Sequence, residues 1–104
     1  MSRKQNVRQQ ELKERLKDML RLARAYIESE IKKDNKNPYN TLIVKAEFLA
    51  RYRVTFSVGY YASERYYSDF ETLGYFETDN NLNAFKVNHD EINKNPYKIE
   101  FPQP

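Results

Sequence analysis

Apolar and polar residues alternate along the middle of the chain. From Leu42 to Tyr60 every even-numbered position is apolar, and the odd positions between them are mostly charged or polar. A period of two is typical of a strand with one buried face and one exposed face. The alternation therefore predicts a strand over residues 41–61. Because this strand would be about 70 Å long if straight, we expect it to bend near Leu49–Arg51.

A helix over Thr41–Arg51 is the competing interpretation of the first half of this segment. Residues 45–50 are mostly good helix formers, and Leu49 departs from the alternation. Since all ten even positions from Leu42 to Tyr60 fit the strand pattern, we favour the strand.

The N-terminal third has a different period. Its apolar residues recur at steps of three and four, the spacing of one helix face. They are Leu12, Leu16, Met19, Leu20, Ala23, Ile27 and Ile31. The stripe predicts an amphipathic helix from about Asn6 to Lys33, which ends at Asp34–Pro38 because proline does not continue a helix. Residues 1–9 are expected to form a flexible basic tail, since the stripe becomes dense only from Leu12.

The remaining third predicts further strands. Residues 65–78 form a second strand with a bulge at Gly74, and Asp79–Asn81 is a turn. Residues 82–88 form a third strand, residues 89–94 a polar turn and residues 97–101 a last strand. The expected fold is α+β: a single domain, residues 1–104, in which the long N-terminal helix packs across an antiparallel β-meander of three to four strands.

Charge is distributed unevenly along the chain, whose net charge is +3. Residues 1–33 carry +5 and residues 34–65 carry +2, whereas residues 66–104 carry −4. This asymmetry favours an anionic partner on one side or head-to-tail self-association, including a homodimer through the N-terminal helix. The start of the chain is polar, and no apolar run approaches the roughly 20 residues of a membrane span. We therefore expect a cytoplasmic protein that binds no membrane.

Residues suited to catalysis are few. The absence of cysteine excludes disulfides, thiolate zinc sites and a cysteine nucleophile. His89, the one histidine, lies among polar residues and is expected to be a solvated turn residue. The two glycines, Gly59 and Gly74, do not form a phosphate-binding loop. We therefore predict no catalytic residues, no metal site and no cofactor.

Residues suited to binding are more numerous. Four cations of the helix form one row at steps of four, four and three. Two arginines lie on the face of the predicted long strand that is expected to be exposed to solvent, and another arginine follows the next turn. One tyrosine of each Tyr-Tyr pair is expected to point outward. The candidate contact residues are Lys13, Lys17, Arg21, Arg24, Arg51, Arg53, Tyr61, Arg65 and Tyr67.

Three functional hypotheses follow. The favoured one is a small non-enzymatic interaction protein, such as an adaptor, assembly factor or inhibitor, that binds a larger protein or nucleoprotein complex. Its small size and lack of cofactor motifs suit a modulator encoded by a phage or mobile element. The alternative is a nucleic-acid-binding module that uses the basic helix face and the Arg/Tyr-rich hairpin. A small enzyme or ligand-binding barrel is the third, and only the expected architecture supports it.

Overall fold

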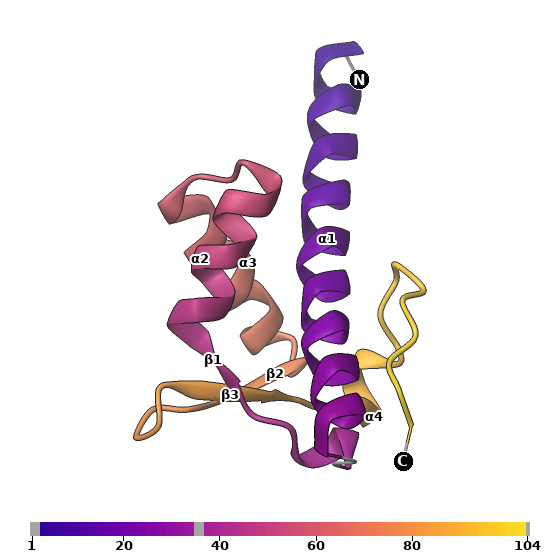
Figure 1. The fold of residues 1–104 in the computed structure, drawn as a ribbon. Helices are drawn as coiled ribbons and strands as arrows, with labels where there is room; N and C mark the ends of the chain where they lie inside the picture. Colours follow the sequence, from indigo (N-terminus) through magenta and orange to yellow (C-terminus); the bar gives the residue numbers. More distant parts are fainter. Residues whose placement is uncertain (1–2, 35–36, 104) are drawn as a thin grey trace.

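The computed structural model describes residues 3–34 and 37–103, and within them the chain forms helices around a small sheet (Figure 1). In chain order the elements are α1 (Arg3–Asp34), the 3₁₀ helix η1 (Pro38–Asn40), β1 (Ile43–Val44), α2 (Lys45–Phe56), α3 (Tyr60–Thr72), β2 (Phe76–Asp79), β3 (Ala84–Val87) and α4 (His89–Ile92).

The long N-terminal helix is confirmed, with bounds three residues earlier and one residue later than expected. Four residues of its stripe, Met19, Leu20, Ala23 and Ile27, are fully buried. The molecule measures 48 × 25 × 23 Å, and α1 runs along its long axis with its first turns beyond the α2–α3 hairpin (Figure 1). Residues 3–9 continue the helix and residues 1–2 lie outside the described residues, so flexibility of this segment stays a prediction.

The strand predicted over residues 41–61 is wrong for most of its length. Only Ile43–Val44 is a strand, and Lys45–Phe56 is the helix α2. Phe48, Leu49 and Tyr52 are buried on one face of α2, at the three- and four-residue steps of a helix. The alternation was misleading because apolar residues at every second position include residues four apart. Residues four apart lie on the same face of a helix as well.

The second predicted strand, residues 65–78, is also mostly helical, since α3 extends to Thr72 and β2 begins only at Phe76. The helix ends in a Schellman motif. The Gly74 nitrogen donates to the Glu71 oxygen at 3.0 Å, and the Tyr75 nitrogen donates to the Phe70 oxygen at 2.9 Å. Gly74 has a φ of 81°, which glycine adopts without strain. It therefore ends a helix where a bulge had been expected.

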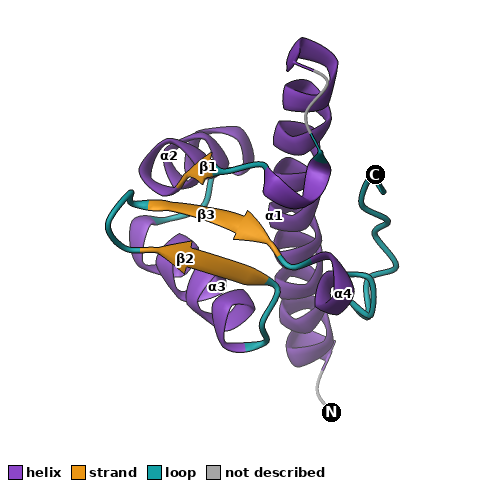
Figure 2. Cartoon of the chain, turned by 90° about the horizontal axis from the view of Figure 1, so that it is seen from below, coloured by secondary structure: helices purple, strands orange, loops and turns teal. Residues whose placement is uncertain are grey.

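The sheet has three antiparallel strands in the order β1-β3-β2. Ile43 lies opposite Phe85, and Phe85 lies opposite Thr78, so the hairpin β2–β3 receives β1 on its β3 side. The predicted turn at Asp79–Asn81 joins β2 to β3, where the Asp79 carboxylate accepts from the Asn81 nitrogen at 3.0 Å. Helices α2 and α3 both lie behind the sheet when it is viewed from below (Figure 2).

The fold class is confirmed: α+β, with a long N-terminal helix packed against a three-stranded antiparallel sheet. Between helices and sheet lies an aromatic core. The Phe76 and Phe85 ring centroids are 4.7 Å apart, and Phe48 and Tyr67 approach Phe85 at 5.1 and 5.2 Å. The polar turn predicted at residues 89–94 includes α4, and the strand predicted at residues 97–101 is instead irregular.

Candidate interaction surface

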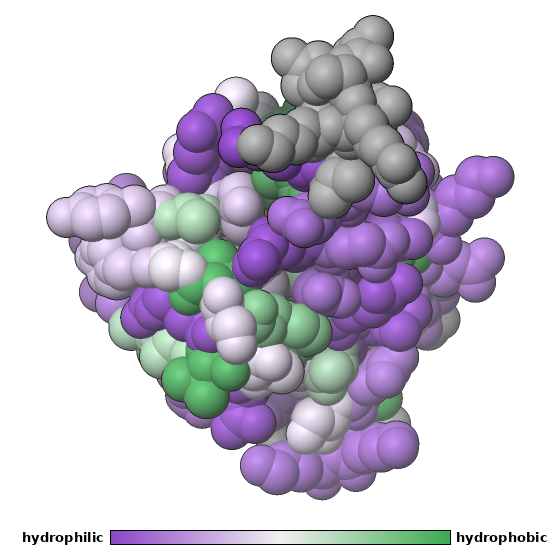
Figure 3. All heavy atoms as spheres, turned by 90° about the horizontal axis from the view of Figure 1, so that it is seen from above, coloured by the Kyte–Doolittle hydropathy of each residue, from purple (hydrophilic) through white to green (hydrophobic). Residues whose placement is uncertain are grey.

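The α2–α3 connection exposes three large side chains at one end of the molecule. Val54 is 84% exposed, Tyr60 58% and Tyr61 86%. We call these three residues the hairpin tip. Apolar and weakly polar side chains gather on the α2–α3 side of this end, beside the hydrophilic side chains of α1 (Figure 3). Large apolar side chains that cluster in this way indicate an interaction site more strongly than isolated ones do.

The α2–α3 connection is short because Ser57 ends α2 and Gly59 begins α3. Ser57 adopts a left-handed conformation, with φ 55° and ψ 47°, and caps the C-terminus of α2. Gly59 has extended backbone and is the N-cap of α3. The chain therefore reverses within three residues, and Val58 between them is buried while the tip on either side stays exposed.

The two α2 arginines do not share a face, contrary to the prediction. On a helix, residues two apart point in widely different directions. The Arg51 guanidinium lies over the Tyr26 ring of α1, 6.0 Å from its centroid. The Arg53 guanidinium lies 5.1 Å from the centroid of Tyr60 and donates to the Ser63 hydroxyl at 3.2 Å. Of the two arginines, only Arg53 therefore contacts the hairpin tip.

The two tyrosine pairs differ in exposure. Tyr61 is outward, as predicted, and its ring lies edge-on to Tyr60 at 5.4 Å. Tyr67 is 1% exposed, so its predicted role as a surface contact is wrong. Its hydroxyl is hydrogen-bonded to Thr78, and burial raises the pKa of Tyr67 to about 12. Arg65, one turn after Tyr61, is exposed on α3.

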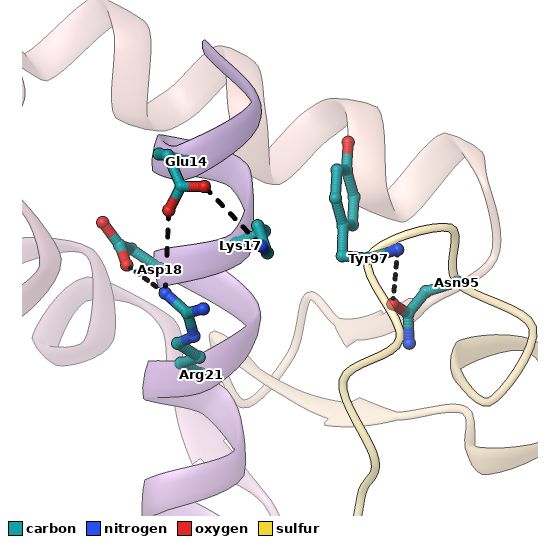
Figure 4. Close-up of polar contacts among 6 residues, drawn as sticks. All are labelled: Glu14, Lys17, Asp18, Arg21, Asn95 and Tyr97. Atoms are coloured by element: carbon teal, nitrogen blue, oxygen red, sulfur yellow. Dashed lines mark hydrogen bonds and ion pairs between the residues drawn. The ribbon is translucent and has the colours of Figure 1, made fainter. Parts of the chain in front are cut away.

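The cation row of α1 is present, but carboxylates of the same helix neutralise much of it. Glu14 lies 3.6 Å from the Lys17 ammonium and 3.9 Å from the Arg21 guanidinium (Figure 4). Asp18 lies 3.1 Å from Arg21. Arg24, the next cation of the row, lies 3.7 Å from Glu28, and Lys13 is exposed one turn before Lys17. The structure therefore brings the row together as ion pairs, not as a strip of unpaired positive charge.

Two buried polar side chains near the C-terminus have structural partners. His89 is 4% exposed, so the expected solvated histidine is wrong: its Nε2 is 3.1 Å from the Pro38 oxygen, and burial lowers its pKa. Asn95 accepts from the Tyr97 nitrogen at 3.0 Å (Figure 4) and donates to the Ile99 oxygen at 2.9 Å. Both residues hold loops against the body of the protein.

Sequence reasoning found Tyr61, Arg53 and Arg65 but missed two residues of the hairpin tip. Val54 and Tyr60 are even-numbered, so the strand interpretation placed them on the buried face. The signal that could have found them is the stripe Phe48, Leu49 and Tyr52, which places Val54 on the opposite side of a helix.

Within residues 3–34 and 37–103, every helix is too short or too polar to span a bilayer. No group of three or more histidine or acidic side chains in this part of the chain could hold a metal ion. Comparisons with protein-family models, with curated proteins and with solved structures give no match to this chain.

Proposed function

We propose that this chain is a small non-enzymatic interaction protein that binds a larger protein through the hairpin tip. The observation that carries the proposal is the exposure of Val54 and Tyr61, at 84% and 86%, together with Tyr60 on the two sides of the connection between two packed helices. A role as an adaptor, assembly factor or inhibitor requires such a surface and no catalytic group.

The chemistry of the hairpin tip fits a protein partner. Tyrosine and arginine are enriched among the residues that contribute most to protein interfaces. Tyr60 is already held between the Arg53 guanidinium and the Tyr61 ring, so little side-chain entropy would be lost when a partner packs against it. Helices α2 and α3 are fixed by the aromatic core beneath them. The tip is therefore a preorganised apolar contact.

A nucleic-acid-binding module remains the second candidate, because the exposed Tyr61 ring lies on the same helix as the exposed Arg65. Such a pair suits stacking on a base together with a phosphate contact. The ion pairs of the α1 row reduce the positive charge that this function requires. We therefore place a protein or nucleoprotein partner first.

Affinity capture from the native host tests the proposal. Three full-length baits are compared: the wild type, the tip variant Val54→Ser/Tyr61→Ser, and a control variant Leu73→Ser/Leu82→Ser. Leu73 and Leu82 are 57% and 60% exposed, so the control removes comparable apolar surface outside the tip. Each capture is performed with and without nuclease.

The proposal requires a protein that the wild type and the control retain, that the tip variant loses, and that nuclease does not release. It must also bind the purified chain directly. Equal retention by the tip variant and the wild type would overturn the role of the tip. Loss of all captured protein on nuclease treatment, with binding to oligonucleotides that weakens steeply with salt, would favour the nucleic-acid module instead.

A further inference from the structure

Positive charge at the hairpin tip has no carboxylate to balance it. Residues 48–63 contain two arginines but no aspartate or glutamate. Glu64 follows directly, but its carboxylate lies 3.9 Å from the ammonium of Lys45, at the other end of α2 from the tip. In the part of the chain that the structure describes, neither Arg53 nor Arg65 forms an ion pair. The tip therefore differs from the cation row of α1, where carboxylates of the same helix neutralise much of the charge.

The neighbouring part of α1 has the same sign of charge. Residues 8–21 contain five basic and three acidic residues, and two of the acidic ones are already paired with cations of the same helix. Phe56, at the end of α2, lines a hollow together with α1 residues 10–18, so this part of α1 lies next to the hairpin (Figure 3). The net positive charge at this end of the molecule therefore comes from two elements, and it attracts an anionic partner.

The Arg53 guanidinium is held in place and keeps donors for a further acceptor. It lies over the Tyr60 ring, and its Nη1 donates to the Ser63 hydroxyl at 3.2 Å. The Ser63 hydroxyl is itself fixed, because it donates to the Tyr60 main-chain oxygen at 2.7 Å. A guanidinium has five N–H donors in a fork that matches the two oxygens of a carboxylate. A carboxylate that binds here would therefore meet a preorganised donor.

The surface around Arg53 asks for apolar groups as well as for an anion. Val54 and Tyr61 are the most exposed large apolar side chains of the described residues, and Arg53 and Arg65 flank them. An apolar centre with charged groups at its edge is the usual arrangement of a protein interface.

Nucleic acid fits this surface less well. Val54 offers no ring on which a base could stack, and Tyr60 is already in contact with Arg53 and Tyr61. A backbone of phosphates also requires a positively charged track, whereas the row of α1 is largely paired. The combination of apolar surface and unpaired arginine therefore favours an acidic protein segment.

We propose that the hairpin tip binds an acidic segment of its partner protein, in which apolar side chains flank a carboxylate. This inference rests on the proposed function and specifies the chemistry of the partner. The apolar side chains pack on Val54 and Tyr61, and the carboxylate accepts hydrogen bonds from Arg53. Arg65, at the edge of the contact, contributes charge that attracts the segment and orients it.

Selection from a library of random peptides displayed on phage tests this chemistry. The full-length chain is immobilised, and peptides that bind the wild type but not the tip variant Val54→Ser/Tyr61→Ser are kept. We expect these peptides to be enriched in aspartate or glutamate next to aliphatic or aromatic residues. A selection that yields no peptide, or peptides without acidic residues, would overturn the proposal.

Fluorescence anisotropy with the tightest selected peptide measures the role of the arginines. Arg53→Gln/Arg65→Gln removes both charges and is expected to raise the Kd by about tenfold or more, since charge-assisted contacts are lost. Lys32→Gln/Lys33→Gln is the matched control, because it removes the same charge from exposed lysines in the last turn of α1. This control is expected to change the Kd by less than about twofold.

Two further measurements separate a lost contact from a damaged fold. Circular dichroism confirms that each variant is folded, and Arg65→Gln alone, at an exposed position, is expected to weaken binding in the same direction. Replacing the acidic residue of the peptide with glutamine should raise the Kd for the wild type but barely change it for Arg53→Gln/Arg65→Gln. Equal losses in both proteins would exclude a contact between the carboxylate and these arginines.

An unchanged Kd in Arg53→Gln/Arg65→Gln would also overturn the proposal. So would a single-stranded oligothymidylate that binds the wild type more tightly than any selected peptide and loses affinity in the same variant, because the tip would then be a nucleic-acid site. Capture from the host distinguishes this failure from failure of the proposed function. A captured protein that the tip variant loses but the arginine variant retains contradicts the partner chemistry alone, whereas one that the tip variant retains contradicts the role of the tip itself.

Discussion

The Tyr52 hydroxyl donates a hydrogen bond of 2.6 Å to the main-chain oxygen of Arg15, 37 residues earlier in the sequence. This contact joins the middle of α2 to α1 where the two helices pack. Tyr52 is fully buried, and burial raises its pKa above the ordinary tyrosine value. The phenol therefore stays protonated and continues to donate throughout the neutral pH range.

Tyr52→Phe removes this donor without changing the shape of the ring. We expect the free energy of unfolding to fall by about 1 kcal/mol, the typical net contribution of one hydrogen bond. Urea denaturation followed by circular dichroism measures the change. Tyr61→Phe is the control, since that hydroxyl is on an exposed side chain, and it is expected to leave stability unchanged. Equal midpoints for all three proteins would contradict the prediction.

Thr78 connects Tyr67 of α3 to Glu71 one turn later. The Thr78 hydroxyl donates to the Glu71 carboxylate, so its oxygen accepts from the Tyr67 phenol. Thr78→Val keeps the shape of the side chain but leaves the buried Tyr67 hydroxyl without this partner, at an expected cost of about 1–3 kcal/mol. In a double-mutant cycle with Tyr67→Phe, the two losses in unfolding free energy should sum to more than the loss of the double variant. Additive losses would show that the hydrogen bond contributes nothing.

Acid is expected to destabilise the fold through His89. Its Nε2 and ring are enclosed by Pro38 and Phe101, and burial lowers its pKa below the unfolded value of about 6.5. Below that pH the unfolded chain binds the proton first, so stability is complete above about pH 6.5 and falls as pH decreases toward the lower folded pKa. The hydrogen bond with the Pro38 oxygen and, to a smaller extent, the charge of Asp90 oppose this lowering of the His89 pKa but do not reverse it.

Urea midpoints measured between about pH 7.5 and 5.5 test this dependence. His89 is the one histidine of the chain, and aspartate and glutamate side chains ordinarily titrate below this pH range. His89→Gln should flatten the dependence on pH in this range, whatever its effect on absolute stability. A variant that keeps the slope of the wild type would exclude His89 as its source.

Two left-handed residues at helix ends provide a pair of opposite predictions. Gly74, with a φ of 81°, ends α3, and an added Cβ would meet the Glu91 side chain at an ordinary 3.7 Å. Gly74→Ala should therefore cost about 1–2 kcal/mol, all of it from backbone strain. Ser57, with a φ of 55°, ends α2 in the same conformation without being glycine. Ser57→Gly relieves that strain and should raise stability by a smaller amount, since glycine loses more chain entropy on folding. Thermal denaturation measures both changes, and shifts of the same sign would contradict the argument.

Elements specified by their own residues could be predicted from the sequence. Helix α1 has 32 residues and no glycine or proline, and its apolar residues fit the helical period but not the strand period. The turn after Asp79 was also predictable, because its carboxylate accepts hydrogen bonds from the backbone just beyond it. Such signals depend on neighbours in the sequence, so they act before any tertiary contact forms.

The candidate site was only partly predictable. Arg53, Arg65 and Tyr61 were expected at the surface, and each lies at or beside the hairpin tip. Their grouping was not predictable, because it depends on the reversal of the chain at Ser57–Gly59. Tyr67, like Tyr61, follows another tyrosine, but it lies on the side of α3 that faces the sheet and is therefore buried.

The sequence by itself determined the long amphipathic helix, the α+β class and the last hairpin of the sheet. Tertiary structure alone decided the state of residues 45–60, because their apolar residues fit a strand at every second position and a helix at every fourth. Phe48 and Tyr52 satisfy both patterns, whereas Val54 fits only the strand and is left 84% exposed. Packing of α2 and α3 against α1 and one face of the sheet buries Phe48, Tyr52 and Tyr67 together, and that shared burial selects the helices.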